Sequence, residues 1–378
     1  MRIGIDCRRI YDVNTNKGAG VERYTYFFVR KLLEKDEKNQ FVLFFFGDIS
    51  SETIHKLKGK NDRVKIVKIL PNKSRIPLIG SHLKFSRVLK KAKLDIAIFP
   101  SGSMPIFYKK NSYVIAHDAA IYINPSWFPE KQWFSTKVVV PRSYKKAKKI
   151  ICVSHNTKND LKTIFKIPDH KIITIYPGVV VKDEYLEDEF QRMKNKFDIK
   201  GEYVLFLGTI EPRKNVANMI KAFSTYLFEN EHSNITFVLA GAKGWKFQLI
   251  FKKLEDVNNR LQNSQIKYIG QVSNRERNIL IKNAKAFVFP SFYEGFGFPV
   301  IEAMALGTPV VTSEGSSLGE IAKGCAVLVD PTDCVSINRG VKQLVDDYAL
   351  SKKLVLSGKE RAGFFSWERT IEEFRKLI

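Results

Sequence analysis

Short apolar runs alternate with amphipathic segments along the whole chain. Apolar positions three and four apart predict helices between the runs, for example over residues 216–228, 275–283 and 336–347. Strands that alternate with helices in this way indicate parallel sheets, so the expected fold class is α/β. The runs with the length and composition of buried strands are residues 2–6, 41–46, 64–69, 95–99, 113–117, 149–153 and 171–176, and then 203–207, 235–240, 266–269, 286–289, 309–312 and 326–329.

The series of strands begins again after Tyr176-Pro177-Gly178, beyond a polar stretch at 182–200 that has no strand signal. We therefore expect an N-terminal domain over residues 1–178 and a C-terminal domain over 179–364, each doubly wound and Rossmann-like. Ligands of such sheets bind outside the carboxyl ends of the strands, so two such domains facing each other would form a cleft. The segment 78–92 could be a helix on a membrane surface or a helix that faces the core.

Composition excludes several classes of protein. The chain has 378 residues, of which 44% are hydrophobic and 12% aromatic, which excludes a mainly disordered chain. No apolar run approaches the roughly 18–20 residues of a membrane-spanning helix. The first residues, MRIGID, read as a strand without a secretory signal. The four cysteines fit no zinc-site spacing, and we expect a cytoplasmic protein with reduced thiols.

Positive charge is concentrated in the N-terminal half. The formal net charge is +24; residues 1–180 carry 35 Lys and Arg against 14 Asp and Glu, whereas residues 181–378 carry 28 against 25. This asymmetry favours an anionic partner such as a membrane surface, a lipid phosphate or nucleic acid, and the alternative is a solvated lysine-rich surface. Because no nucleic-acid-reading motif is present, we expect no specific nucleic-acid binding.

A glycine-rich turn follows the run at 286–289. Gly295 and Gly297 allow a tight turn with close backbone approach, Pro299 suits the first turn of a helix, and Gly307 suits its end. A glycine turn that leads into a helix presents N–H groups to an anion. The segment therefore predicts an anion site, and the alternative is an ordinary capped helix.

Four charged residues complete this candidate site. Glu294 and Glu302 flank the glycine turn, and because acids repel phosphate they are better suited to accept hydrogen bonds from sugar hydroxyls. Arg213 and Lys214 follow the run at 203–207. The planar guanidinium of an arginine and the compact charge of a lysine together suit a diphosphate. The alternative for this pair is an ordinary loop between a strand and a helix.

Two weaker signals lie in the N-terminal half. His117 ends the run at 113–117 and could donate a hydrogen bond to a ligand or act in acid–base chemistry, although a lone histidine is more often structural. Gly18-Ala-Gly20 could let a loop approach a phosphate or could simply form a turn. In the C-terminal half, Asn215 could cap the following helix.

These motifs resemble a known family. The segment Glu294-Gly-Phe-Gly-Phe-Pro-Val-Ile-Glu302 is similar to the E-x7-E signature of retaining glycosyltransferases of family 4, which have the GT-B fold. Residues 208–215 resemble their diphosphate-binding loop, residues 18–20 their N-terminal glycine loop, and His117 their active-site histidine. The end of the chain, about 365–378, resembles a last helix that crosses back to the N-terminal domain.

The resemblance also shows two departures. Thr209 stands where many relatives carry Arg, which leaves Arg213 and Lys214 to hold the diphosphate, and Gly319 stands where Pro is usual. The groups expected at the reaction centre are His117, Arg213, Lys214 and Glu294. The residues expected to contact the donor are Gly18, Gly20, Gly208, Gly241, Val272, Gly295, Phe296, Gly297, Phe298, Pro299, Val300, Glu302 and Leu318.

The resemblance implies transfer of a sugar from a nucleotide diphosphate to an acceptor hydroxyl, with retention at the anomeric carbon. It weakly favours mannose from GDP-mannose, with UDP-, dTDP- and ADP-sugars as other donors, and surface polysaccharide synthesis on a glycan or lipid-diphosphate-linked acceptor. No DxD motif is present, so we expect a reaction without a metal ion or cofactor. Because no convincing nucleophile can be identified, we expect front-face attack in which a phosphate oxygen of the donor takes the acceptor proton. The alternatives are a GT-B epimerase or phosphorylase, or a non-catalytic nucleotide- or anion-binding protein.

Overall fold

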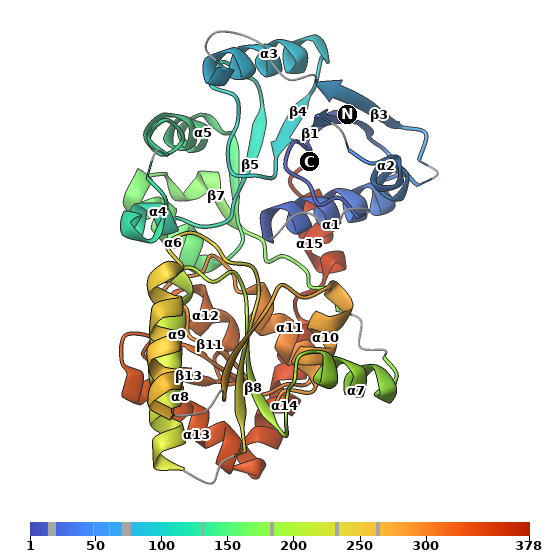
Figure 1. Cartoon of the computed structure of the whole chain (residues 1–378). Helices are drawn as coiled ribbons and strands as arrows, with labels where there is room; N and C mark the ends of the chain where they lie inside the picture. The colour runs from blue at the N-terminus through green and yellow to red at the C-terminus, as the bar shows by residue number, and fades with distance from the viewer. Residues whose placement is uncertain are drawn as a thin grey trace. The chain divides into compact units, whose positions relative to one another are not determined.

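The computed structural model of the chain forms two compact units. The structure describes residues 1–13, 20–47, 49–59, 61–69, 77–130, 132–181, 185–230, 234–261 and 265–378. Unit 1 comprises Met1–Ile123, Glu130–Gly178 and Ser366–Ile378, and unit 2 comprises Asn124–Pro129 and Val179–Phe365. Figure 1 shows a sheet covered by helices in each unit.

Unit 1 is built on a seven-stranded parallel sheet with the strand order β3-β2-β1-β4-β5-β6-β7. The strands are β1 (Arg2–Asp6), β2 (Gln40–Phe46), β3 (Val64–Ile69), β4 (Ile96–Phe99), β5 (Ser112–Ala116), β6 (Lys149–Cys152) and β7 (Ile172–Thr174). The helices are α1 (Gly20–Lys35), α2 (Ser51–Lys58), α3 (Pro77–Lys91), α4 (Ala120–Ile123), a π-helical turn (Ser135–Val139), α5 (Val140–Lys146), α6 (His155–Phe165), a 3₁₀ turn (Asp169–Lys171) and α15 (Trp367–Arg375).

Unit 2 is built on a six-stranded parallel sheet with the order β10-β9-β8-β11-β12-β13. The strands are β8 (Tyr203–Leu207), β9 (Thr236–Ala240), β10 (Ile266–Gly270), β11 (Ala286–Phe289), β12 (Val310–Ser313) and β13 (Val327–Val329). The helices are α7 (Glu187–Lys196), α8 (Val216–Glu229), α9 (Gln248–Leu261), α10 (Asn274–Lys282), α11 (Phe298–Leu306), α12 (Ser316–Ala322), α13 (Cys334–Asp346) and α14 (Tyr348–Gly363), with 3₁₀ turns at Pro125–Trp127 and Pro212–Lys214.

Both sheets have the strand order of doubly wound Rossmann-like folds, so the predicted fold class is confirmed. Each predicted strand is present, and its ends lie within two residues of the predicted ones. The order reverses next to the first strand of each unit, between β1 and β4 and between β8 and β11. Ligands of such sheets bind at the carboxyl ends of the strands beside this reversal.

Apolar strands form the cores of the two sheets. In unit 2 the rings of Phe206 on β8 and Phe289 on β11 are stacked, with centroids 5.7 Å apart. In unit 1, α3 contributes Phe85 and Leu89, both buried, to the core. One face of this helix therefore packs on the core, as the second of the two interpretations expected. None of the helices in the described ranges is both long and apolar enough to cross a membrane.

Two segments belong to a unit from which they are separated in the sequence. Helix α15 belongs to unit 1, where Trp367 stacks on Phe27 of α1 and Thr370 donates to the carbonyl of Tyr176 (2.7 Å). Conversely, Asn124–Pro129 belongs to unit 2, whereas the sequence placed it in the N-terminal domain. There, Trp127 stacks on Phe292 with ring centroids 5.9 Å apart.

The polar stretch at 182–200, which has no strand signal in the sequence, contains α7. This helix is mostly exposed and is tied to α10 by ion pairs. Arg275 donates two hydrogen bonds to Glu189 (2.7 and 2.8 Å), and Lys196 binds Glu276 (2.5 Å). Partners this far apart in the chain are not visible in a local hydrophobic pattern.

Candidate functional site

The candidate site of unit 2 lies where its strand order reverses. One loop leaves the carboxyl end of β8 and carries Arg213 and Lys214 on a 3₁₀ turn. A second loop leaves the carboxyl end of the neighbouring strand β11 and carries Glu294. The loops are joined directly, because the amide of Phe292 donates to the carbonyl of Arg213 (3.0 Å). The topology therefore brings together the charged residues that the sequence predicted as parts of one site.

These charged side chains form one ion-pair cluster. Arg213 donates from Nη1 to Glu294 (2.9 Å) and to the carbonyl of Tyr293 (2.8 Å), and from Nη2 to Glu211 (2.9 Å). Lys214 donates to the other oxygen of Glu294 (2.5 Å). The side chains of Arg213 and Lys214 are 12% exposed, and that of Glu294 is 11% exposed. We call these four residues, Glu211, Arg213, Lys214 and Glu294, the clamp.

Burial and pairing oppose each other in the clamp. Burial disfavours the charge on Glu294, but Arg213 and Lys214 outweigh it and hold the pKa of this carboxyl at about 2. Burial lowers the pKa of Lys214, and Glu294 offsets only part of that effect. Burial raises the pKa of Glu211, against the attraction of Arg213. Two cations are thus held in a partly desolvated place, where their interaction with an anionic ligand is stronger than in water.

A tight turn beside the clamp precedes α11. Gly297 has φ +111°, and a Cβ there would lie 2.6 Å from Cδ2 of Leu318. Pro299 lies in the first turn of α11, and Gly307 ends it with φ +81°, as the sequence predicted. Ser317 fixes the turn, because its hydroxyl donates to the carbonyls of Glu294 and Phe296 (both 2.8 Å). The segment 316–320 resembles the family's late phosphate loop, but the sequence does not indicate that Ser317 binds the glycine turn.

The side chains of several predicted donor-contact residues belong to the core. Val300 and Leu318 are fully buried, and the ring of Phe296 packs against Phe298 and Phe365. The side chains of Phe296, Val300 and Leu318 therefore hold the loops in place, and only the backbone of this part of the site is suited to meet a ligand.

Gly208 and Gly241 permit the loops after β8 and β9 to approach each other. Gly241 has φ +139°, and a Cβ there would lie 1.9 Å from the carbonyl oxygen of Gly208. A similar constraint explains Gly319, because a Cβ at this position would lie 1.9 Å from the carbonyl oxygen of Glu314. The unusual residue at 319 is thus required by the local turn of this chain.

Glu302 pairs with a cation that is not part of the clamp. It is on α11, 4% exposed, and forms an ion pair with Arg277 of α10. Arg277 was missed by the sequence analysis, because nothing local indicates that it meets a residue 25 positions away. Val272 lies beyond β10, the edge strand of this sheet.

One predicted local interaction is wrong. Asn215 precedes α8, but its side chain does not cap the helix. It adopts a left-handed conformation (φ +63°) and donates instead to the carbonyls of Pro290 (2.9 Å) and Pro331 (2.6 Å). Asn215 thereby fastens the clamp loop to the loops after β11 and β13.

The remaining predicted residues lie in the N-terminal half. His117 directly follows β5, and its Nε2 lies 2.5 Å from the carbonyl oxygen of Pro100. Because a carbonyl only accepts, Nε2 carries the proton and Nδ1 is an acceptor. Burial lowers the pKa of His117, which favours this neutral form. Gly20 is the first residue of α1, and Gly18 lies outside the described residues.

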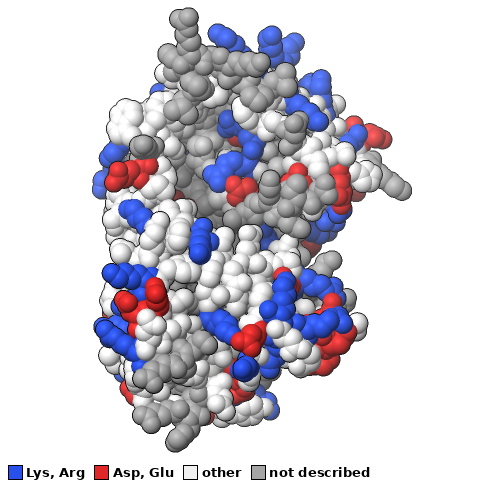
Figure 2. Space-filling model, in the orientation of Figure 1, with Lys and Arg blue, Asp and Glu red and all other residues white. Residues whose placement is uncertain are grey.

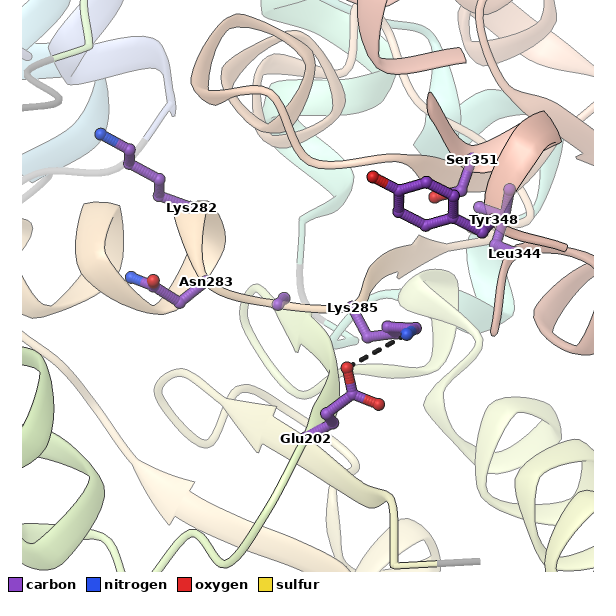
Figure 3. A pocket seen from close by; sticks show the side chains of 8 residues that line it. Glu202, Lys282, Asn283, Lys285, Leu344, Tyr348 and Ser351 are labelled. Atoms are coloured by element: carbon purple, nitrogen blue, oxygen red, sulfur yellow. Dashed lines mark hydrogen bonds and ion pairs between the residues drawn. The ribbon is translucent and has the colours of Figure 1, made fainter. Parts of the chain in front are cut away.

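A separate hollow of about 270 Å³ lies at the amino ends of the central strands β8 and β11 in unit 2. Figure 3 shows Glu202 and Lys285, which directly precede β8 and β11 and are joined by an ion pair of 3.0 Å. Tyr348, Leu344 and Ser351 line its other side. Because ligands of doubly wound sheets bind at the carboxyl ends, we do not assign the donor to this hollow. Within the ranges that the structure describes, no group of three His, Cys, Asp or Glu side chains is placed to hold a metal ion.

Comparisons with known proteins agree with this geometry. The family model "Glycosyl transferases group 1" matches residues 187–361, and "Glycosyltransferase Family 4" matches residues 18–183. The chain belongs to glycosyltransferase family 4. This glycosyltransferase is therefore a transferase that uses a nucleotide sugar, and the recognition made from the sequence is confirmed.

Individual relatives are similar over part of their length. "O-antigen chain mannosyltransferase B" of Escherichia coli is 29% identical over 69% of this chain and 69% of that protein. "Serotype-specific mannosyltransferase WbdA" of Escherichia coli is 26% identical over 62% of this chain, and the match spans only 29% of WbdA. The crystal structure of Anabaena Alr3699/HepE in complex with UDP-glucose has a TM-score of 0.77 at 15% identity and covers all of both chains, which supports the GT-B fold.

Proposed function

We propose that this glycosyltransferase transfers mannose from GDP-mannose, with retention, to a glycan or lipid-linked acceptor during surface polysaccharide synthesis. The observation that carries the proposal is the clamp at the carboxyl ends of β8 and β11, where Arg213 and Lys214 are held side by side. The names of the two Escherichia coli relatives support mannose as the sugar. In this proposal unit 2 binds the donor and unit 1 binds the acceptor.

The clamp has the chemistry to stabilise a leaving diphosphate. As the bond between the anomeric carbon and the phosphate oxygen breaks, negative charge accumulates on the diphosphate. Arg213 and Lys214 donate to it, together with the backbone amides at the start of α11, and this stabilisation requires no metal ion. Glu294 then accepts hydrogen bonds from the sugar hydroxyls, and Glu302 accepts hydrogen bonds from the ribose.

Retention follows from attack on the face that the diphosphate leaves. The acceptor oxygen forms its bond to the anomeric carbon, and its proton passes to the departing phosphate oxygen, so atoms and charge balance. His117 contacts the sugar, and its Nδ1 accepts a hydrogen bond from a sugar hydroxyl because Nε2 is engaged by Pro100. A covalent glycosyl–enzyme adduct, sought by mass spectrometry of denatured reaction mixtures, would contradict this route.

A basic face of unit 1 supports an anionic membrane as the place where a lipid-linked acceptor is met. Residues 63–94 and 131–159 contain no Asp or Glu. Figure 2 shows Lys and Arg side chains at the top of the view, where Figure 1 draws α3. Each cation near such a surface contributes about 1 kcal/mol of attraction.

Exposed apolar side chains accompany these cations. Trp133 is 67% exposed and Ile79 on α3 is 40% exposed. The two segments meet, because the rings of His82 and Phe134 are 6.0 Å apart. Tryptophan favours the headgroup region, so binding to vesicles with anionic lipid is expected at low salt. If the protein sediments no more with anionic than with neutral vesicles, this part of the proposal fails.

The donor is tested first by thermal unfolding with GDP, UDP, ADP and dTDP in EDTA. A ligand at one hundred times its dissociation constant stabilises the folded state by about 2.7 kcal/mol. A selective shift with GDP, followed by EDTA-resistant transfer of mannose with an α-anomeric product by NMR, is the expected result. Stabilisation by none of the four nucleotides would overturn the assignment of the clamp, and loss of transfer in EDTA would overturn metal independence.

A further inference from the structure

A second buried ion pair lies in unit 2, apart from the clamp. It joins Arg277 on α10 to Glu302 on α11, and the two side chains are only 12% and 6% exposed. A charge buried to this extent is costly unless a partner of opposite sign compensates it. Each residue therefore constrains the other.

Arg277 stands where the backbone alone disfavours a cation. Ser273 caps α10 together with Glu276, and the amide of Arg277 donates to the carbonyl of Ser273 (2.8 Å), so Arg277 lies in the first turn of this helix. The positive end of the helix dipole repels a guanidinium there. The pairing with Glu302 offsets this repulsion, so an arginine at position 277 is accounted for by its carboxylate partner and not by the helix alone.

Glu302 has the capacity to serve a ligand while Arg277 holds it. A carboxylate can accept about four hydrogen bonds, so a guanidinium at Oε2 is compatible with two further hydroxyl donors. Two adjacent ribose hydroxyls are such a pair of donors. A carboxylate whose rotamer is already fixed also loses less conformational freedom when the ligand binds.

We propose that Arg277 is a positioning residue that orients Glu302 toward the two ribose hydroxyls of the donor. The proposal rests on the proposed function, in which Glu302 meets the ribose. It predicts that Arg277 acts on recognition of the hydroxyls and not on affinity for the diphosphate. A purely structural tie between α10 and α11 would instead weaken binding of every nucleotide equally.

The test compares a ribonucleotide with an analogue that lacks both hydroxyls. Calorimetry gives the dissociation constants of GDP and 2′,3′-dideoxy-GDP, and of the corresponding uridine pair, for the full chain, Arg277→Met, Arg277→Lys and Arg275→Met. Arg275 is the matched control, because it lies two residues away on α10 and forms an exposed pair with Glu189.

The full chain should prefer the ribonucleotide by about tenfold to a hundredfold, since hydrogen bonds to a charged acceptor are lost in the analogue. Arg277→Met should abolish most of this preference while the affinity for the dideoxy analogue changes less than about threefold. Arg277→Lys should retain part of the preference, and Arg275→Met should retain all of it. If Arg277→Met fails to fold, the comparison of Arg277→Lys with the full chain still tests the proposal.

Four outcomes would overturn the proposal, and one of them would overturn the proposed function as well. If Arg277→Met keeps the full preference, or weakens both nucleotides equally, Arg277 does not position Glu302, and the proposed function stands. If Arg277→Met binds the ribonucleotide more tightly, Arg277 competes with the ribose instead of orienting its acceptor. If the full chain binds no nucleoside diphosphate at all, the proposed function fails and this inference fails with it.

Discussion

The first strand of each unit leads to an acid and an arginine two residues apart, but the two pairs differ in what they can bind. In unit 1, Arg8 closes on Asp6 with two side-chain hydrogen bonds (both 2.8 Å), and its guanidinium lies 4.0 Å from the centre of the Phe85 ring. In unit 2, Arg213 bridges Glu211 and Glu294. At the same place in the topology, the arginine of unit 1 binds one acid twice, which we call the closed pair, whereas the arginine of unit 2 binds two different acids.

The difference lies in how two adjacent cations are paired at each place: Arg9, next to Arg8, pairs with Glu22 of α1, whereas Lys214 shares Glu294 with Arg213. Asp6, with a side chain 1% exposed, accepts hydrogen bonds from Nε and Nη2 of Arg8, so a diphosphate that binds Arg8 in the same way would have to break this bidentate pair. In the clamp, Lys214 is a second cation beside Arg213, and both can exchange a carboxylate for a phosphate. We therefore expect the diphosphate to bind at the clamp and not at Asp6, although both lie next to a reversal of strand order.

The largest expected effect is that of Arg213→Ala on transfer. The substitution removes a donor to the leaving diphosphate and leaves Glu211 and Glu294 short of a partner, so turnover should fall about a hundredfold, equivalent to roughly 3 kcal/mol. Initial rates of sugar transfer measure it. Arg192→Ala, which breaks an exposed pair with Asp188 on α7, is the control and should leave turnover unchanged. Near-normal turnover in Arg213→Ala would contradict the role of the clamp.

The second effect is a pH-dependent loss of stability on Glu294→Gln. Because the folded pKa of Glu294, about 2, lies below the ordinary 4.5, its ionised form stabilises the fold above pH 4.5, and this contribution disappears as the pH falls toward 2. The gap in unfolding free energy between the full chain and the variant should therefore narrow by about 3 kcal/mol between pH 7 and pH 2. Denaturant titrations across this range measure the gap.

The control for this titration is Glu52→Gln, which removes the acid of an exposed pair with Lys56. Both side chains of that pair are 48% exposed, so solvent screens them and the gap should hardly change with pH. A gap for Glu294→Gln that is as flat as that of the control would show that Arg213 and Lys214 do not stabilise its charge.

A smaller effect is expected for Arg8→Ala in unit 1. The variant leaves the buried carboxylate of Asp6 without its two side-chain donors, which should cost about 2 kcal/mol of unfolding free energy. The affinity for the nucleoside diphosphate should stay within twofold of that of the full chain, because Arg8 is already paired with Asp6 and we expect it not to bind the diphosphate. Calorimetry measures the affinity of the variant for the nucleotide. A clear loss of affinity would show that Arg8, like Arg213, takes part in nucleotide binding.

The sequence predicts the strands well because each buried strand is a compact apolar run, such as residues 203–207 on β8. It also predicts the turn at Gly297, since only glycine readily adopts its backbone conformation. It does not reveal that Arg277 meets Glu302 or that Ser317 fixes the glycine turn. Those contacts depend on which helices the strand order places together, and no local propensity encodes that order.

The smallest single effect is expected at Gly20, which we compare with Gly241 because the sequence assigned both glycines to the same role. Alanine at Gly241 would require φ +139° and a Cβ 1.9 Å from the Gly208 carbonyl oxygen, so Gly241→Ala should lose about 3 kcal/mol of stability. A Cβ at Gly20 meets no described atom within 4 Å, and Gly20→Ala in α1 should gain up to about 1 kcal/mol. Thermal unfolding measures both changes. Transfer assays then separate donor binding from folding. Because Gly20→Ala is expected to keep the fold, a reduced rate of sugar transfer would indicate that Gly20 contacts the donor. An unchanged rate would show that Gly20 is not part of the site.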